Sequence, residues 1–137
     1  MQPQILINTQ YIKDFSLEIP GAPEIFKELK EQPSLNIDVS IKTKNLEDDF
    51  YEVIFNTSIN ADTKTSKFFI IELAYGCVVK TDAKDNELKE ILNIFVPQQL
   101  FPFIRSTIAN SMVSSGLAPI MLPPIDFLSL YKEKNAK

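Results

Sequence analysis

The sequence predicts an α+β fold with one four-stranded antiparallel sheet followed by two to three helices. Apolar and polar residues alternate with a period of two in four stretches between residues 4 and 79, which is the pattern of strands with one buried face. From Asp85 onward the apolar residues recur every three or four positions, as on a helix. Strands that come first, with helices after them, are typical of an α+β domain. The 137-residue length fits a single domain over residues 1–137.

The first predicted strand covers residues 4–19. Its odd positions are mainly apolar and its even positions mainly polar, so one face of the strand is expected to be buried. The proline-containing segment 20–34 that follows is too long for a hairpin turn, and the next strand need not pair with the first. The apolar positions are Ile5, Ile7, Tyr11, Phe15, Leu17 and Ile19.

Three further strands are predicted at 35–43, 50–61 and 68–79, with polar turns at 45–49 and 62–67 between them. The last strand is apolar on both faces, since Phe68 and Ile70 alternate with its main apolar set. Such a strand is expected to be covered on both sides, and a second subunit is one way to supply the second cover. The main apolar faces hold Leu35, Ile37, Val39 and Ile41; Tyr51, Val53, Phe55 and Ile59; and Phe69, Ile71, Leu73 and Tyr75.

Helices are predicted at 85–95, at 97–115 and at 126–135. Pro97 suits the first turn of the second helix and Gly116 suits the position just past its end, whereas Pro102 should bend that helix or mark its start. Asp126 is a suitable N-cap for the last helix. An apolar stripe on the second helix consists of Phe101, Ile104, Ile108 and Met112.

The amino-acid composition disfavours several classes of function. The chain has no histidine and one cysteine, Cys77, so the commonest general base, metal ligand and nucleophile pairs are missing. The net charge of −4, with Arg105 as the single arginine, disfavours a nucleic-acid binder. The N-terminus lacks the pattern of a signal peptide, and these features together predict a cytoplasmic protein. Cys77 is expected to be a small buried residue, and Asp48 and Asp49 a solvated turn.

An apolar, proline-rich loop follows the second predicted helix. The stretch "GLAPIMLPPIDFLSLY", residues 116–131, holds three prolines, many large apolar residues and a single charge. Loops usually face water and are polar, so the cluster indicates a surface that binds apolar partners, although any one of its side chains could simply pack on the sheet.

Two long segments resemble the SecB family of bacterial protein-export chaperones. They are "YIKDFSLEIPGAPEIF" at 11–26 and "LFPFIRSTIANSMVSSGLAPIMLPPIDFLSLY" at 100–131, and they occur in the family's order. The motif "DDFYEV" and the pair Glu72 and Gly76 fall where the family has its third and fourth strands. Two departures are the absence of tryptophan and the presence of Cys77 in place of a second glycine.

The resemblance implies a homotetramer, built as a dimer of dimers, that binds unfolded precursor proteins without ATP and passes them to the SecA motor. It implies no cofactor. The acidic residues are scattered rather than spaced as a ligand loop, so no metal site is predicted. The groove for extended, apolar polypeptide would be formed by Phe26, Leu29, Leu35, Ile37, Tyr51, Leu117, Ile120, Met121, Leu122, Ile125 and Phe127. The patch that docks SecA would consist of Asp14, Glu18, Ile70 and Glu72. Residues expected to influence assembly are Phe69, Ile71, Leu73, Tyr75, Ile104, Ile108 and Met112.

Three alternatives stay open. Without the resemblance, Asp14 and Glu18 would be read as part of a solvated strand face. A related chaperone could serve one client only, such as a toxin–antitoxin pair. A small ligand-binding protein or proton-transfer enzyme could use Asp14 with Tyr11, or Asp126 with Tyr131. An enzyme would need a closed pocket holding an acid of raised pKa, whereas a chaperone that holds unfolded chains needs an open groove.

Overall fold

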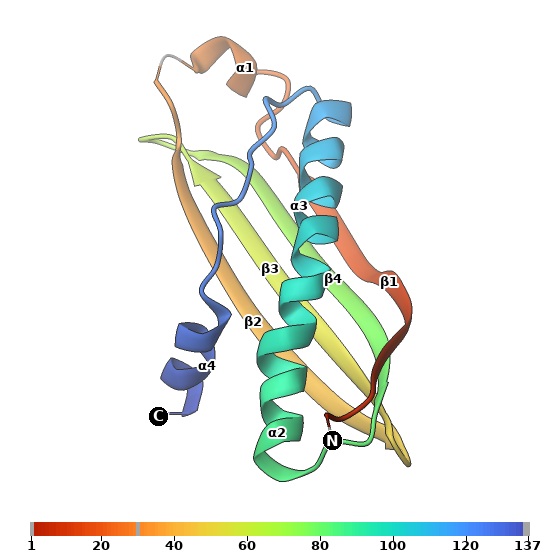
Figure 1. The fold of residues 1–137 in the computed structure, drawn as a ribbon. Coiled ribbons are helices and arrows are strands. Elements are labelled where there is room, and N and C mark those ends of the chain that lie inside the picture. The colour runs from red at the N-terminus through yellow and green to blue at the C-terminus, as the bar shows by residue number, and fades with distance from the viewer. Residues whose placement is uncertain (1, 30, 136–137) are drawn as a thin grey trace.

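The predicted fold class is confirmed by a computed structural model that describes residues 2–29 and 31–135 (Figure 1). The four strands form one antiparallel sheet in the order β1-β4-β3-β2, so β1 does not pair with β2. The elements are β1 (Ile5–Glu18), α1 (Ile25–Glu28), β2 (Ser34–Glu47), β3 (Phe50–Asp62), β4 (Lys67–Thr81), α2 (Asp85–Glu90), the π-helical segment η1 (Ile91–Phe95), α3 (Val96–Ser114) and α4 (Phe127–Asn135).

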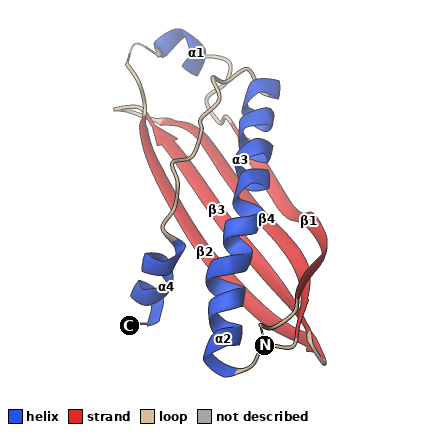
Figure 2. Cartoon of the chain, in the orientation of Figure 1, coloured by secondary structure: helices blue, strands red, loops and turns tan. Residues whose placement is uncertain are grey.

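The molecule has two layers. Figure 2 shows α2, α3 and α4 on the same side of the sheet, which we call the inner face. Alternate residues of β3 and β4 point to this side, where Phe55 and Ile71 are fully buried with Ile104 of α3. The opposite side, the outer face, carries no helix among the described residues. The hydrophobic core therefore lies on one side of the sheet only.

Two register shifts displace part of β1. The strand gains one residue after Ile7 and another after Ile12 relative to β4. A shift of one residue moves the side chains that follow to the opposite face. Tyr11 lies between the two shifts and faces Gly76 on the outer face, so the prediction that Tyr11 belongs to the buried face of the strand was wrong. The second bulge restores the original alternation, so the alternation of apolar residues in the sequence does not reveal either bulge.

A third shift, at the start of β4, changes the position of Phe68. The pairing of β3 with β4 is irregular between Ala61 and Asp62, next to Phe68. The Phe68 ring contacts both Phe69, at 5.2 Å between centroids, and Phe26 of α1, at 6.1 Å. Phe68 is therefore buried under α1 of the same chain, and no second subunit is needed to cover it.

One continuous helical segment replaces two predicted helices. α2, η1 and α3 follow one another without a break from Asp85 to Ser114. The ring of Pro97 cannot donate a hydrogen bond and crowds the preceding turn, and the wider π-helical turn directly before α3 accommodates it. Pro102 lies inside α3, so it does not mark the start of the helix.

Gly116 ends α3, as predicted. Its φ of +79° is the left-handed conformation that glycine adopts without strain. The Gly116 N–H donates to the carbonyl of Val113 at 3.2 Å, and the Leu117 N–H donates to the carbonyl of Met112 at 2.9 Å. This pair of hydrogen bonds is a Schellman motif, which directs the following segment back over the sheet. We call residues 117–126 the strap, because they connect α3 to α4 across the inner face (Figure 1).

The strap leads into α4. The Ser129 N–H donates to Oδ1 of Asp126 at 3.1 Å, which confirms Asp126 as the N-cap. At the other end of α4, Nζ of Lys134 donates to the carbonyl of Ile41 at 2.9 Å and ties the helix to the edge strand β2. Within the described part of the chain, no helix is both long and apolar enough to cross a membrane.

Candidate functional site

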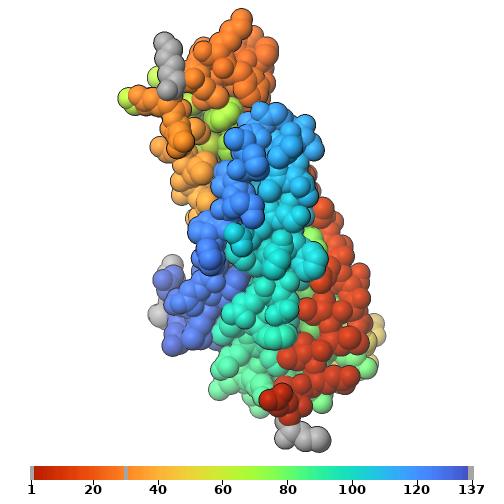
Figure 3. Space-filling model, turned by 45° about the horizontal axis from the view of Figure 1, so that its top comes forward, coloured from red at the N-terminus to blue at the C-terminus, as the bar shows by residue number. Residues whose placement is uncertain are grey.

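An apolar groove of about 390 Å³ lies at one end of the inner face. It is bounded by α1 and the following loop on one side and by the end of α3 and the start of the strap on the other, all at the same end of the molecule (Figure 1, Figure 3). Leu35 near the start of β2 and Phe68 and Phe69 near the start of β4 complete it. Its lining consists of Phe26, Leu29, Gln32, Pro33, Leu35, Phe68, Phe69, Met112, Gly116, Leu117, Ala118 and Ile120.

Five predicted groove residues meet in this groove. Phe26 and Leu29 come from the α1 segment, Leu35 from β2, and Leu117 and Ile120 from the strap. Segments that are about ninety residues apart in the sequence therefore share one apolar surface. Ile37 occupies the next inner-face position along β2 and is partly exposed there.

Two large apolar side chains of this groove remain open to solvent. Phe26 is 44% exposed and Leu35 is 45% exposed, although both are large and apolar. The ring of Phe26 stands at 83° to that of Phe68, in an edge-to-face contact. The groove thus offers uncovered aromatic and aliphatic surface of the kind that marks binding sites.

Other predicted groove residues lie elsewhere. Tyr51 pairs with Asn45, whereas Leu35 pairs with Ala61, ten residues further along β3. At ~3.3 Å per residue, about 33 Å separates the two positions. Because β3 is long, Tyr51 does not form a common floor with Leu35 and Ile37, and that prediction was wrong.

Of three strap residues and one α4 residue predicted to line the groove, some are buried in the core and others are exposed to solvent. Leu122 and Phe127 are buried, and the Phe127 ring lies 5.7 Å from that of Phe55. Ile125 packs partly against the core, while Met121 is 61% exposed and lies outside the groove lining. The strap is thus anchored at some positions and open at others.

The seven residues expected to influence assembly all lie in the core of the chain. Phe69, Ile71, Leu73 and Tyr75 of β4 face the inner side, and Ile104, Ile108 and Met112 of α3 pack onto them. Their side chains contact one another rather than solvent. Phe69 and Met112 additionally line the apolar groove, although the sequence did not predict them there.

On the outer face, the four predicted partner-binding residues come together. Asp14 pairs with Ala74 and Glu18 pairs with Ile70, while Glu72 lies opposite Ser16 between them. Because this register alternates, Asp14, Glu18, Ile70 and Glu72 point to the same side, and we call this set the acidic surface. A depression of about 230 Å³ extends from Asp14 and Glu72 across the sheet to Asp38 on β2.

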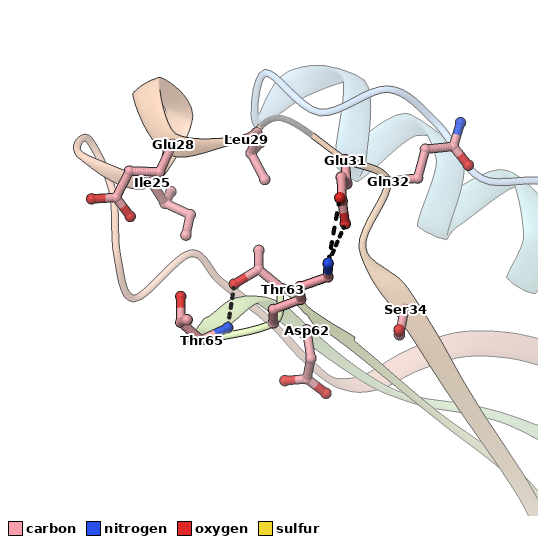
Figure 4. A pocket seen from close by; sticks show the side chains of 10 residues that line it. Ile25, Glu28, Leu29, Glu31, Gln32, Ser34, Asp62, Thr63 and Thr65 are labelled. Atoms are coloured by element: carbon pink, nitrogen blue, oxygen red, sulfur yellow. Dashed lines mark hydrogen bonds and ion pairs between the residues drawn. The ribbon is translucent and has the colours of Figure 1, made fainter.

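A second, polar pocket of about 300 Å³ lies beneath α1 (Figure 4). The side chain of Glu31 points toward the turn between β3 and β4, where Nζ of Lys64 lies 3.5 Å from its carboxylate. Both side chains are exposed, and such a pair contributes little to stability. In this turn the Ser66 N–H donates to Oγ1 of Thr63 at 3.0 Å, so polar groups of the turn are hydrogen-bonded to one another.

The residues considered for an enzyme have other partners or an opposite pKa shift. Tyr11 donates its hydroxyl hydrogen bond to Glu52 rather than to Asp14. The hydrogen bonds from Ser129 lower the pKa of Asp126, opposite to the shift that a general acid needs at neutral pH. Cys77 is buried, and desolvation raises the pKa of its thiol to about 11. Among the described residues, no group of three or more acidic or cysteine side chains is placed to hold a metal ion.

Comparisons with known proteins agree on one family. A family model described as "Preprotein translocase subunit SecB" matches residues 1–137. The protein-export protein SecB of Rickettsia felis is 40% identical over 137 residues, covering 98% of this chain and 90% of the relative. The protein-export protein SecB of Paramagnetospirillum magneticum is 38% identical over 136 residues, covering 98% of this chain and 88% of the relative.

One solved structure has the same fold. It is a SecB-like chaperone from Mycobacterium tuberculosis in complex with a ChAD peptide from the HigA1 antitoxin. The TM-score is 0.73, with 88% of this chain and 90% of that chain covered. The sequences are only 10% identical, so this similarity concerns the fold alone.

Proposed function

The chain belongs to the SecB family, and we propose that it is a bacterial protein-export chaperone that holds unfolded precursor proteins in the apolar groove. The observation that carries the proposal is the uncovered apolar surface of Phe26 and Leu35 between α1, β2 and the strap. An extended client segment that covers these side chains removes apolar area from water, at roughly 25 cal/mol per Å². This attraction has little directional demand, which suits many client sequences and requires no ATP.

A partner that carries positive charge would dock on the opposite side of the sheet. The acidic surface combines Asp14, Glu18 and Glu72 with the apolar Ile70, and the family resemblance assigns this patch to SecA. Complementary charge accelerates encounter and fixes orientation, while Ile70 supplies a small apolar contact. The chaperone can therefore hold a client on the inner face and contact the motor with the outer face, in the cytoplasm.

Assembly into a homotetramer, as a dimer of dimers, is the third part of the proposal. Ile12 of β1 and Phe103 and Val113 of α3 are large apolar side chains that remain exposed in the single chain. A second copy packed against β1 and α3 would remove this apolar area from water. Light scattering at micromolar concentration is expected to give the mass of four chains, and a monomer would contradict this part.

A chaperone devoted to a single antitoxin client is the alternative. The relatives that share 34–40% identity with this chain are export proteins, whereas the antitoxin-bound chaperone shares 10%. We therefore favour export. A pull-down that recovers several precursor proteins supports this choice, and recovery of one antitoxin alone would reverse it.

The test of the groove uses two leucines of the same strand. Leu35 lines the groove, and Leu46 lies near the other end of β2 at 41% exposure. The unmodified protein is expected to delay refolding of an unfolded precursor at near-stoichiometric amounts. Leu35→Ser should weaken this effect about fivefold, and the matched control Leu46→Ser should not. No delay with several clients would contradict the proposed function.

A further inference from the structure

Three polar side chains on the outer face connect strands that are not neighbours in the sheet. The Tyr11 hydroxyl of β1 donates a hydrogen bond to the Glu52 carboxylate of β3, although β4 lies between them. Nζ of Lys13 donates to both carboxylate oxygens of Glu52, at 3.1 and 3.0 Å. The Glu52 side chain is only 15% exposed. We call Tyr11, Lys13 and Glu52 the bridging cluster.

Gly76 is what allows the bridging cluster to cross β4. It faces Tyr11 from one neighbouring strand and Ile54 from the other. A Cβ atom at Gly76 would lie 2.7 Å from Cε2 of Tyr11 and 2.8 Å from Cδ1 of Ile54, closer than real contacts permit. The Tyr11 ring therefore lies on the bare backbone of β4 and reaches Glu52 on the far side.

The cluster includes the residue at which β1 changes register. Ile12 pairs with Tyr75 and Asp14 pairs with the next residue, Ala74, so Lys13 is the extra residue of a β-bulge. Without this bulge, Asp14 would pair with Leu73 and point to the inner face, and Glu18 would follow it. The bulge is thus what brings Asp14 and Glu18 to the same face as Glu72.

We propose that Tyr11, Lys13 and Glu52 are positioning residues for partner docking: by bonding the bulge residue Lys13 and its neighbour Tyr11 to β3, they fix the register that presents Asp14 and Glu18 on the outer face. The cluster acts on charge as well. Because the Lys13 ammonium pairs with Glu52, it is directed away from the carboxylates of the acidic surface. The inference rests on the proposed docking of SecA at the acidic surface.

The pKa of Glu52 is consistent with this geometry. The hydrogen bond from Tyr11 lowers it, and the bond and charge of Lys13 lower it further. The carboxylate therefore stays ionised at neutral pH, where it can hold both partners.

The experiment measures SecA affinity by titration calorimetry and β1 register by amide NMR, on the assembled full-length protein. Tyr11→Phe removes one bond of the cluster, and Glu52→Ala removes all three. We expect affinity to fall about threefold for the first and about tenfold for the second, with amide shifts that change most at residues 11–18. Glu87→Gln, which changes an exposed acidic residue on α2, is the control and should leave both measurements unchanged.

A double-mutant cycle separates positioning from a general loss of stability. In a background of Asp14→Asn with Glu18→Gln, Glu52→Ala should cause no further loss of SecA affinity, because the residues that it positions have already been neutralised. Additive losses, or a full loss of affinity without amide shifts in β1, would overturn the inference. If the background pair alone leaves SecA affinity unchanged, the proposed docking surface itself is wrong.

Discussion

The two faces of the sheet differ in what their side chains stabilise. On β4, Leu73 is buried under α3, while the adjacent Glu72 lies exposed on the acidic surface. The inner face provides the free energy of folding and, at one end, an uncovered groove. The outer face provides charge and contributes little buried area. A single strand with period two can therefore contribute to the core on one face and present charged side chains on the other, and substitutions on the two faces should have different consequences.

The largest change in the free energy of unfolding is expected in the strap, where a buried position and an exposed position are adjacent. Leu122 is 1% exposed, and truncation of a buried leucine leaves a cavity, so Leu122→Ala should lower the free energy of unfolding by about 2–5 kcal/mol. Met121→Ala should change it by less than about 0.5 kcal/mol. Urea unfolding of both variants provides the measurement, and equal losses would show that the strap is not anchored as described.

The burial of Leu122 also changes how the groove can be tested. Leu122 was predicted to bind clients, but because it is buried, a substitution there would disturb folding before it disturbs binding. Leu35, Phe26 and Ile120 are better positions, since they line the groove.

A second, smaller loss of folding stability should appear at alkaline pH. Burial raises the pKa of Cys77 on the inner face from 9.0 to about 11, so the folded state favours the neutral thiol. The stability that this shift supplies is complete below pH 9 and is lost as pH rises toward 11, by about 2 kcal/mol. Cys77→Ala should reduce the loss in unfolding curves recorded between pH 8 and 11. Burial also raises the pKa of Tyr11 and Tyr75, so part of the loss should remain. An unchanged pH dependence would contradict the assignment to Cys77.

Much of the architecture could be predicted from the spacing of apolar residues and from the residues that begin and end helices and turns. The alternation in β2 and β3, the stripe on α3 and the positions of Gly116 and Asp126 each have a local cause that the sequence displays. The acidic surface followed from resemblance and was brought together by the register of β1 and β4.

What could not be predicted depends on pairing between distant strands. The two compensating bulges place Tyr11 on the outer face, and the irregular start of β4 brings Phe68 under α1. The separation of Tyr51 from Leu35 arises from strand length. Each of these results from contacts across the sheet, which a single sequence does not specify.

A third prediction concerns the exposed aromatic of the groove. Phe26→Ala should weaken binding of an unfolded client about fivefold, because the ring supplies apolar contact area, while the free energy of unfolding should fall by about 1 kcal/mol. Leu128→Ala on α4, a residue of similar exposure outside the groove, is the matched control. Fluorescence anisotropy with a labelled precursor gives the affinity. Equal losses in the two variants would mean that general surface hydrophobicity, rather than the groove, binds clients.

The smallest effect on folding is expected on the outer face, where the effect on binding should be specific. Asp14→Lys with Glu18→Lys alters exposed positions, so the free energy of unfolding should change by no more than about 0.5 kcal/mol per site. SecA docking should weaken and lose its sensitivity to salt, because the attractive long-range charge is removed. Client binding should persist, since the groove lies on the inner face.

Glu87→Lys with Glu90→Lys on α2 makes the same change in net charge and should leave docking intact. Affinities for SecA and for an unfolded client, measured at two salt concentrations, compare the faces directly. If both double variants weaken docking equally, net charge governs the contact; if the Asp14 and Glu18 variant loses client binding as well while it remains folded, the two faces do not function separately.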